Sequence, residues 1–260
     1  SIKGIVFVLS IDKVQLCNAI RGHYGSDLID AEEYLRRFID VEYLLPEPDV
    51  ESYCKYLYEY FGFQLFLEDI DRRPYAEFLD DSDRFLKCAK EIVKAKNLSL
   101  RQVEKLFVHA RLVLSSCACN QYVFPQSMLM LVYIRSVDPR FYFQITRKQL
   151  SVQEIADRIP QIFPTEMFQE PTRYAQKAAL WGLAEIFYCY AQSFERTGRS
   201  LEIISEGRTP DEIKLTFDID YVDNARLAKA INYNYDRYRG AYWSHIVNAI
   251  DLLNPIVEKE

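Results

Sequence analysis

The chain opens with an apolar run, Ile5 to Leu9, that has no polar alternation and is rich in β-branched and aromatic residues. Such a run is typical of a strand that is covered on both faces, as in the parallel sheets of α/β proteins. Ser10 and Asp12 follow, and Asp12 with Gln15 has the spacing of a capping box. The pattern therefore predicts a buried strand, a polar edge and a helix, in that order.

A strand of this kind needs parallel neighbours, each reached through a crossover of a dozen or more residues. We therefore expect the chain to be the C-terminal part of a larger protein whose upstream part carries most of the sheet. Ligands of open α/β sheets bind beyond the carboxyl ends of the strands, where Ser10 and Asp12 would lie. A second, short extended segment is predicted over "VEYLLP", which Pro46 and Pro48 close.

From residue 49 onward the apolar spacing becomes that of helices. Asp49, Ser99 and Ser151 are expected N-caps, and Gly62 is expected to end a helix. Alternating apolar positions predict a small β-hairpin within residues 200–220. The predicted helices cover residues 49–62, 80–97, 99–117, 124–145, 151–159, 172–198 and 224 to about 253.

Composition narrows the class of protein. The 260 residues are 49% hydrophobic, which is enough for a sizeable core. The net charge of −6 argues against broad nucleic-acid affinity, because phosphate neutralisation needs clustered Lys and Arg. The longest apolar stretch, Ala178 to Ala191, contains Glu185 and is shorter than the roughly 20 residues of a membrane-spanning helix. Six scattered cysteines indicate a reduced, cytosolic chain.

Three local motifs have plainer interpretations that we favour. "FQLFLEDIDRR", residues 63–73, resembles a Walker B strand, but its apolar part is short and no Gly-Lys pair of a phosphate loop exists in the chain. We therefore expect a loop or the start of a helix between two lid helices. Cys117 and Cys119 lack a second pair of ligands, so we expect buried thiols and no metal. The Tyr- and Arg-rich segment 232–243 could stack nucleobases, although a packing stripe is the commoner outcome.

The order of these elements resembles the end of the nucleotide-binding domain in KAP-family P-loop NTPases. The likeness is carried by "VFVLSIDKVQLCNAIRGHYG" and "DAEEYLRRFIDVEYLLPEPD", then by "LSLRQVEKLFVHARLVL" and an apolar helix that ends in "RSVDPRFY". It covers approximately residues 5–155, and its specificity lies in the order and spacing of short motifs.

The resemblance implies a mainly α fold. One parallel strand and a short strand would be the C-terminal remnant of a P-loop α/β core, followed by an all-helical lid and a helical extension with a small β-hairpin. The implied parts are residues 1–48, 49–160 and 161–260. The Walker A and Walker B segments lie outside this sequence, so we do not expect the chain alone to bind ATP.

The resemblance also implies roles for five residues. Ser10 and Asp12 stand at the sensor position beside the nucleotide. Arg37, with Arg36 before it, stands where a basic residue could reach a γ-phosphate as an arginine finger does. Arg101 stands where a lid arginine could couple hydrolysis to lid movement. Taken without the resemblance, Asp12 is a helix cap and the three arginines are surface cations.

The expected function is the sensor and lid part of a bacterial cytoplasmic ATPase that couples hydrolysis to conformational change or assembly, with anti-phage defence as one setting. ATP and Mg²⁺ are the cofactors expected for the full-length protein, and none is expected for this chain alone. Expected partners are the missing N-terminal NTPase core and a second copy or another protein. A non-enzymatic helical interaction module stays open as an alternative, as does a less favoured single-stranded nucleic-acid binder.

Overall fold

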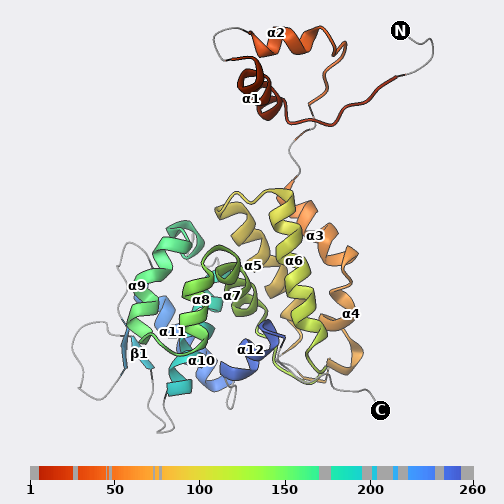
Figure 1. The fold of residues 1–260 in the computed structure, drawn as a ribbon. Helices are drawn as coiled ribbons and strands as arrows, with labels where there is room; N and C mark the ends of the chain where they lie inside the picture. Colours follow the sequence, from red (N-terminus) through yellow and green to blue (C-terminus); the bar gives the residue numbers. More distant parts are fainter. Residues whose placement is uncertain are drawn as a thin grey trace. The chain divides into compact units, whose positions relative to one another are not determined.

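Nearly all regular elements of the described residues are helices (Figure 1), as expected for the mainly α class. The structure, a computed structural model, describes residues 6–25, 29–44, 46, 49–72, 74–75, 78–169, 177–194, 201–203, 213–215, 222–237 and 243–252. Two compact units are present: the N-terminal unit, residues 1–47, and the helical unit, residues 48–260. The finer expected division of the helical unit at residue 160 stays a prediction.

The N-terminal unit contains two short helices, α1 (Lys13–Tyr24) and α2 (Ala31–Arg36). Asp30 begins α2 by accepting hydrogen bonds from the backbone N–H groups of Glu32 and Glu33. The two helices contact each other through a very small core, whose buried members among the described residues are Cys17, Ala31 and Leu35. A core of this size supplies little hydrophobic stabilisation.

The two strands expected in residues 1–48 do not form in the described part of this unit. Residues 6–12 and 41–44 belong to no helix or strand, and the side chains of Val6, Phe7 and Val8 are 81–89% exposed. A strand is completed by backbone hydrogen bonds to a neighbouring strand. The described residues of the N-terminal unit provide no such neighbour, so the prediction of strands is wrong for this chain by itself.

The helical unit begins with α3 (Val50–Tyr60), α4 (Gln64–Leu67), the 3₁₀ helix η1 (Ile70–Arg72), α5 (Asp81–Ala95) and α6 (Leu100–Ser115). It continues with α7 (Pro125–Val137), α8 (Pro139–Thr146), α9 (Val152–Ile162) and the 3₁₀ helix η3 (Thr165–Met167). The last elements are α10 (Ala178–Phe194), β1 (Leu201–Ile203), β2 (Ile213–Leu215), α11 (Asn224–Arg237) and α12 (Trp243–Ile250).

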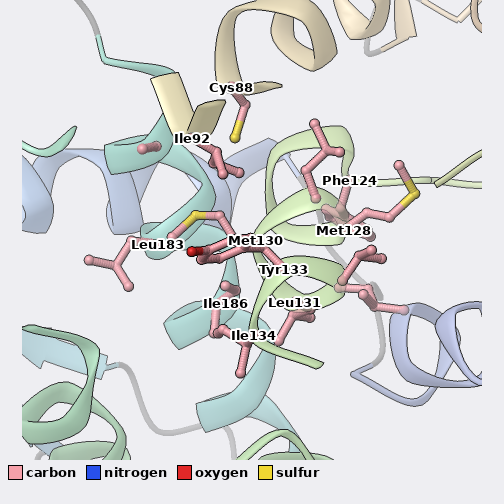
Figure 2. Packing of buried hydrophobic residues seen from close by; sticks show 14 of the residues in the cluster. Cys88, Ile92, Phe124, Met128, Met130, Leu131, Tyr133, Ile134, Leu183 and Ile186 are labelled. Atoms are coloured by element: carbon pink, nitrogen blue, oxygen red, sulfur yellow. The ribbon is translucent and has the colours of Figure 1, made fainter. Parts of the chain in front are cut away.

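Helix α7 lies at the centre of the helical unit and contacts α5, α6, α8, α10 and α12. Every residue from Pro125 to Ile134 is buried, as befits a helix that is surrounded on all sides. Figure 2 shows Met128, Met130 and Ile134 of α7 among side chains that include Cys88 of α5 and Leu183 of α10. The core therefore draws its residues from segments that are far apart in the sequence.

The expected N-caps Asp49, Ser99 and Ser151 and the expected helix end at Gly62 are confirmed. Asp49 accepts a hydrogen bond from Ser52 N–H at 2.8 Å, which caps α3. Ser99 and Ser151 begin α6 and α9 as members of capping boxes. Gly62 follows α3 with φ +67°, a left-handed conformation in which a side chain would be strained. These ends depend on local interactions only.

The single helix expected over residues 124–145 is wrong, because α7 ends at Val137 and α8 begins at Pro139. Pro139 has no backbone N–H and disfavours helical geometry in the residue before it. Asp138 accordingly has φ −136° and ψ 79°, and its carboxylate accepts a hydrogen bond from Phe141 N–H at 2.9 Å. The same residue therefore closes one helix and caps the next.

The predicted β-hairpin is also wrong, because β1 and β2 pair in parallel, with Leu201 opposite Ile213. A hairpin requires antiparallel strands. Alternation in the sequence indicated the strands, but their direction depends on packing: β1 contacts α11 and β2 contacts α9. The long helix expected from 224 to about 253 corresponds to two helices, α11 and α12, and residues 238–242 between them lie outside the described residues.

Candidate functional site

The sensor residues lie on the N-terminal unit, at the start of α1. Asp12 accepts a hydrogen bond from Gln15 N–H at 3.0 Å, so the expected cap is present. The reciprocal bond from the Gln15 side chain is not formed among the described residues, so the motif is half of a capping box. Ser10 is exposed in the segment before the helix. Both side chains are accessible to a ligand or a partner.

The basic pair is at the end of α2. Arg36 is in its last turn, Arg37 is its C-cap, and both side chains are exposed. A cation at this end of a helix is favoured by the helix dipole. The described residues contain no ion pair of either arginine, although the charge of Arg37 acts on the neighbouring Tyr34. The basic pair is thus free of an acidic partner in the described part of the chain.

An ion pair connects the two exposed apolar segments of the N-terminal unit. Lys13 Nζ lies 2.8 Å from a carboxylate oxygen of Glu42, and this contact raises the pKa of Lys13. Since Lys13 follows Asp12 and Glu42 lies within residues 41–44, the ends of the two segments are close together. The sensor position and the expected short strand therefore share one side of this small unit.

Arg101 lies in the helical unit, as the second residue of α6, where its side chain is exposed. The capping box formed by Ser99 and Gln102 fixes the start of this helix. Arg101 belongs to the helical unit, whereas the other four candidates belong to the N-terminal unit. Its role toward a nucleotide stays a prediction.

The described part of the Walker B-like segment, residues 63–72, forms helical turns and no strand, which confirms the expected loop or helix start. Residues 64–67 form α4 and residues 70–72 form η1. Arg72, which sequence reasoning missed, is 1% exposed, and its guanidinium lies 2.6 Å from a carboxylate oxygen of Asp81. It also donates hydrogen bonds to the carbonyl oxygens of Cys119 and Gln121.

Aromatic rings enclose this buried ion pair. The Arg72 guanidinium lies 4.8 Å from the ring centroid of Phe66 and 4.1 Å from that of Phe78. A fully enclosed Arg with protein partners on most of its N–H groups cannot bind an external phosphate. The arrangement instead ties η1, the start of α5 and the loop before α7 together.

Two further carboxylates with partners on other helices were not predicted, the partly buried Glu91 and the buried Glu185. Glu91 of α5 accepts hydrogen bonds from the N–H groups of Ala178 and Ala179, at 3.1 and 2.7 Å, and so caps α10. Burial raises the pKa of Glu91. Glu185 of α10 accepts a hydrogen bond from the Ser127 hydroxyl near the start of α7. For Glu185 the sequence signal was a single acid inside an apolar helix, and Glu91 had no such signal because α5 carries many charged residues.

The remaining motifs are the cysteine pair and the Tyr- and Arg-rich segment. No group of three or more potential metal ligands occurs in the described part of the chain, and Cys117 donates its S–H to the carbonyl oxygen of Val113. In the Tyr- and Arg-rich segment, Trp243 is buried against Tyr190, and the ring of Tyr233 packs edge-on against Trp181. These two contacts fit a packing stripe, although Tyr233 is half exposed. The side chains of Tyr235, Arg237, Tyr238, Arg239 and Tyr242 are not described, so the interpretation of the whole segment stays a prediction.

No protein-family model matches the chain, and neither a curated protein nor a solved structure matches it. Among the described helices, none combines the length and the apolar character needed to cross a membrane. The assignment of a function therefore rests on the residues and on their arrangement.

Proposed function

We propose that the N-terminal unit completes the α/β core of a KAP-like P-loop ATPase and that the helical unit is the lid and extension of that enzyme. The observation that carries the proposal is the exposure of a strand-like apolar segment beside the sensor residues. Val6, Phe7 and Val8 are 81–89% exposed, and Val41, Tyr43 and Leu44 are 80–84% exposed. Contiguous apolar surface of this kind marks a site for another protein segment.

A parallel sheet is the partner that best fits these segments. Both are rich in residues that favour strands, and both have unpaired backbone in the described residues. Sheet pairing would bury the apolar side chains and would leave Ser10 and Asp12 at the carboxyl end of a strand. Arg36 and Arg37, on the same unit, would then provide cations near that edge.

In this proposal, the upstream part of the protein supplies the phosphate loop, its lysine and the Mg²⁺ ligands. Arg37 stabilises the charge that develops on the γ-phosphate, either in its own subunit or in a neighbouring one. Asp12 and Ser10 hold the sensor position, and Arg101 couples the lid to the nucleotide. The setting is a cytoplasmic switch or assembly machine, for which anti-phage defence is one use.

The decisive experiment is ATP turnover by the full-length protein. Arg37→Ala is expected to reduce turnover by about 10³-fold or more while nucleotide binding is retained, because an arginine finger acts mainly in the transition state. Arg140→Ala is the matched control, since Arg140 is exposed on α8 of the helical unit. Unchanged turnover in Arg37→Ala would remove the finger role, and micromolar ATP binding by this chain alone, measured by calorimetry, would contradict its dependence on an upstream core.

The second candidate function, a non-enzymatic assembly module, is supported by an aromatic row on α3. The rings of Tyr53 and Tyr56 stack with centroids 6.2 Å apart, and those of Tyr56 and Tyr60 with centroids 5.6 Å apart. Tyr56 and Tyr60 are more than half exposed. If this row is an interface between copies, Tyr56→Ser with Tyr60→Ser should lower the mass measured by light scattering, with or without nucleotide.

A further inference from the structure

A polar cluster lies inside the core of the helical unit, where α5, α7 and α10 contact one another. Glu185 of α10 is 2% exposed and Ser127 of α7 is 0% exposed. The Ser127 hydroxyl oxygen lies 2.5 Å from a carboxyl oxygen of Glu185 and 3.1 Å from the carbonyl oxygen of Gly182. The contact thus joins the start of α7 to the middle of α10 inside the core.

The number of hydrogens in this cluster depends on the protonation of Glu185. The Ser127 hydroxyl has one hydrogen and two acceptors within reach. When Glu185 is neutral, its O–H donates to Ser127 Oγ, and Ser127 donates to the Gly182 carbonyl, so all three groups are satisfied. When Glu185 is ionised, the Ser127 hydroxyl can donate its one hydrogen to the carboxylate only if it gives up the hydrogen bond to the Gly182 carbonyl oxygen.

The charges around Glu185 do not compensate a buried carboxylate. Arg84 of α5 favours the ionised form and Asp81 of the same helix opposes it, while burial is the largest influence and raises the pKa of Glu185 to about 7. The thiols of Cys88 on α5 and Cys189 on α10 are also near, and burial raises the pKa of both, which keeps them neutral. Within the described residues, the protonation of Glu185 itself therefore sets the charge of the cluster.

The close approach of α7 and α10 makes the cluster sensitive to such a change. A Cβ atom added at Gly182 would lie 2.8 Å from Cβ of Gln126 and 2.9 Å from Sδ of Met130. The side-chain oxygen of Gln126 is buried and has no hydrogen-bond partner among the described residues. The two helices are in direct contact here, so a new charge cannot be accommodated by a small adjustment of side chains.

We propose that the contact between Glu185 and Ser127 is a proton-dependent latch that holds the start of α7 against α10. The carboxyl of the unfolded chain loses its proton near its usual pKa of 4.5, whereas the folded chain keeps the proton until about pH 7. Between these values the folded state binds more protons than the unfolded state, so stability falls as the pH rises. Above this window no further loss occurs. The latch is independent of any nucleotide.

The test combines a titration with hydrogen exchange of the intact chain. We expect the carboxyl ¹³C signal of Glu185 to titrate with a midpoint near 7. The opening constants of amides in α7 and α10, corrected for intrinsic exchange, should rise roughly 100-fold from pH 5 to pH 8. Glu185→Gln, which resembles the neutral acid, should abolish this rise. Glu104→Gln, on an exposed position of α6, should leave it unchanged.

A second variant shows whether the hydroxyl takes part. The hydrogen bond from Ser127 favours the ionised carboxyl, so Ser127→Ala should move the titration midpoint of Glu185 upward. A midpoint below 5 in the unmodified chain would overturn the proposal, as would an equal pH dependence in Glu185→Gln. Because the titration uses the unmodified chain, the outcome is decided even if Glu185→Gln fails to fold.

Discussion

The two units differ in the exposure of their apolar runs. In the N-terminal unit, the run from Val6 to Leu9 is exposed, and among the unit's described residues the buried cluster consists of Cys17, Ala31 and Leu35. In the helical unit, the comparable run from Met128 to Ile134 is buried on every side. An apolar run thus indicates that its side chains favour burial. Whether they are buried depends on which other segments pack against the run.

The two units also differ in whether their hydrogen-bonded polar groups are exposed or buried. The polar groups of the N-terminal unit that begin its helices, Asp12 and Asp30, are exposed at the surface. The helical unit encloses Arg72, Asp81 and Glu185, each with partners from other segments. Enclosed groups of this kind are costly to leave unpaired, so they make the helical unit cooperative. We therefore expect the largest loss of stability where a substitution removes the partner of a buried charge in the helical unit.

The largest effect is expected for Asp81→Ala, which removes the acidic partner of the buried Arg72. The uncompensated guanidinium would be 1% exposed, so unfolding in urea should require about 3–5 kcal/mol less free energy. Far-UV circular dichroism would follow the transition.

The control for this change is on the same helix. Asp83 pairs with Lys87, and both side chains are about 60% exposed, so Asp83→Ala should change the free energy by less than about 0.5 kcal/mol. Equal effects of the two substitutions would mean that the Arg72 cluster adds no more to stability than a surface pair does.

Such buried pairs mark the limit of prediction from sequence. The caps at Asp49, Ser99 and Ser151 were predictable because their partners lie within the next turn. Arg72, by contrast, donates hydrogen bonds to carbonyl oxygens 47 and 49 residues away. The local sequence "IDRR" does not indicate that this arginine is buried. The break before Pro139 had a visible signal in the proline, but the apolar periodicity continued through it.

The candidate site was less predictable than the helices. The positions of Asp12 and Arg37 at helix ends follow from local sequence, and the structure places them on one unit. Whether they face a nucleotide depends on segments that would cover Val6 to Leu9. A strand and an exposed apolar segment have the same local pattern, since the difference lies in a neighbour and not in the run itself.

A second prediction compares two thiols of similar burial. Cys17 is 4% exposed in the N-terminal unit and Cys88 is 0% exposed in the helical unit. Local opening of the small unit should cost far less free energy, so iodoacetamide should modify Cys17 at least about 100-fold faster, as read by mass spectrometry of peptides. The rates should become equal in concentrated urea. Similar rates under native conditions would mean that the small unit is as stable as the large one.

The smallest change in the free energy of unfolding is expected for substitutions of exposed apolar residues. Val8 is 89% exposed and Val103 is 1% exposed, and the same change, valine to threonine, can be made at both. Val103→Thr buries a hydroxyl in α6 and should lower the free energy of unfolding by about 1–3 kcal/mol. Val8→Thr should change it by less than about 0.5 kcal/mol, because the side chain is in water in both states.

The same pair of variants also tests the proposed core. In the full-length protein, a sheet that covers Val6 to Leu9 would bury Val8, so Val8→Thr should then cost as much as Val103→Thr. If Val8→Thr hardly changes the free energy of unfolding of the full-length protein, no sheet buries Val8. The proposed ATPase core would then lose its main support. A cost already present in this chain alone would instead mean that its own residues cover Val8, and the contrast between the two units would disappear.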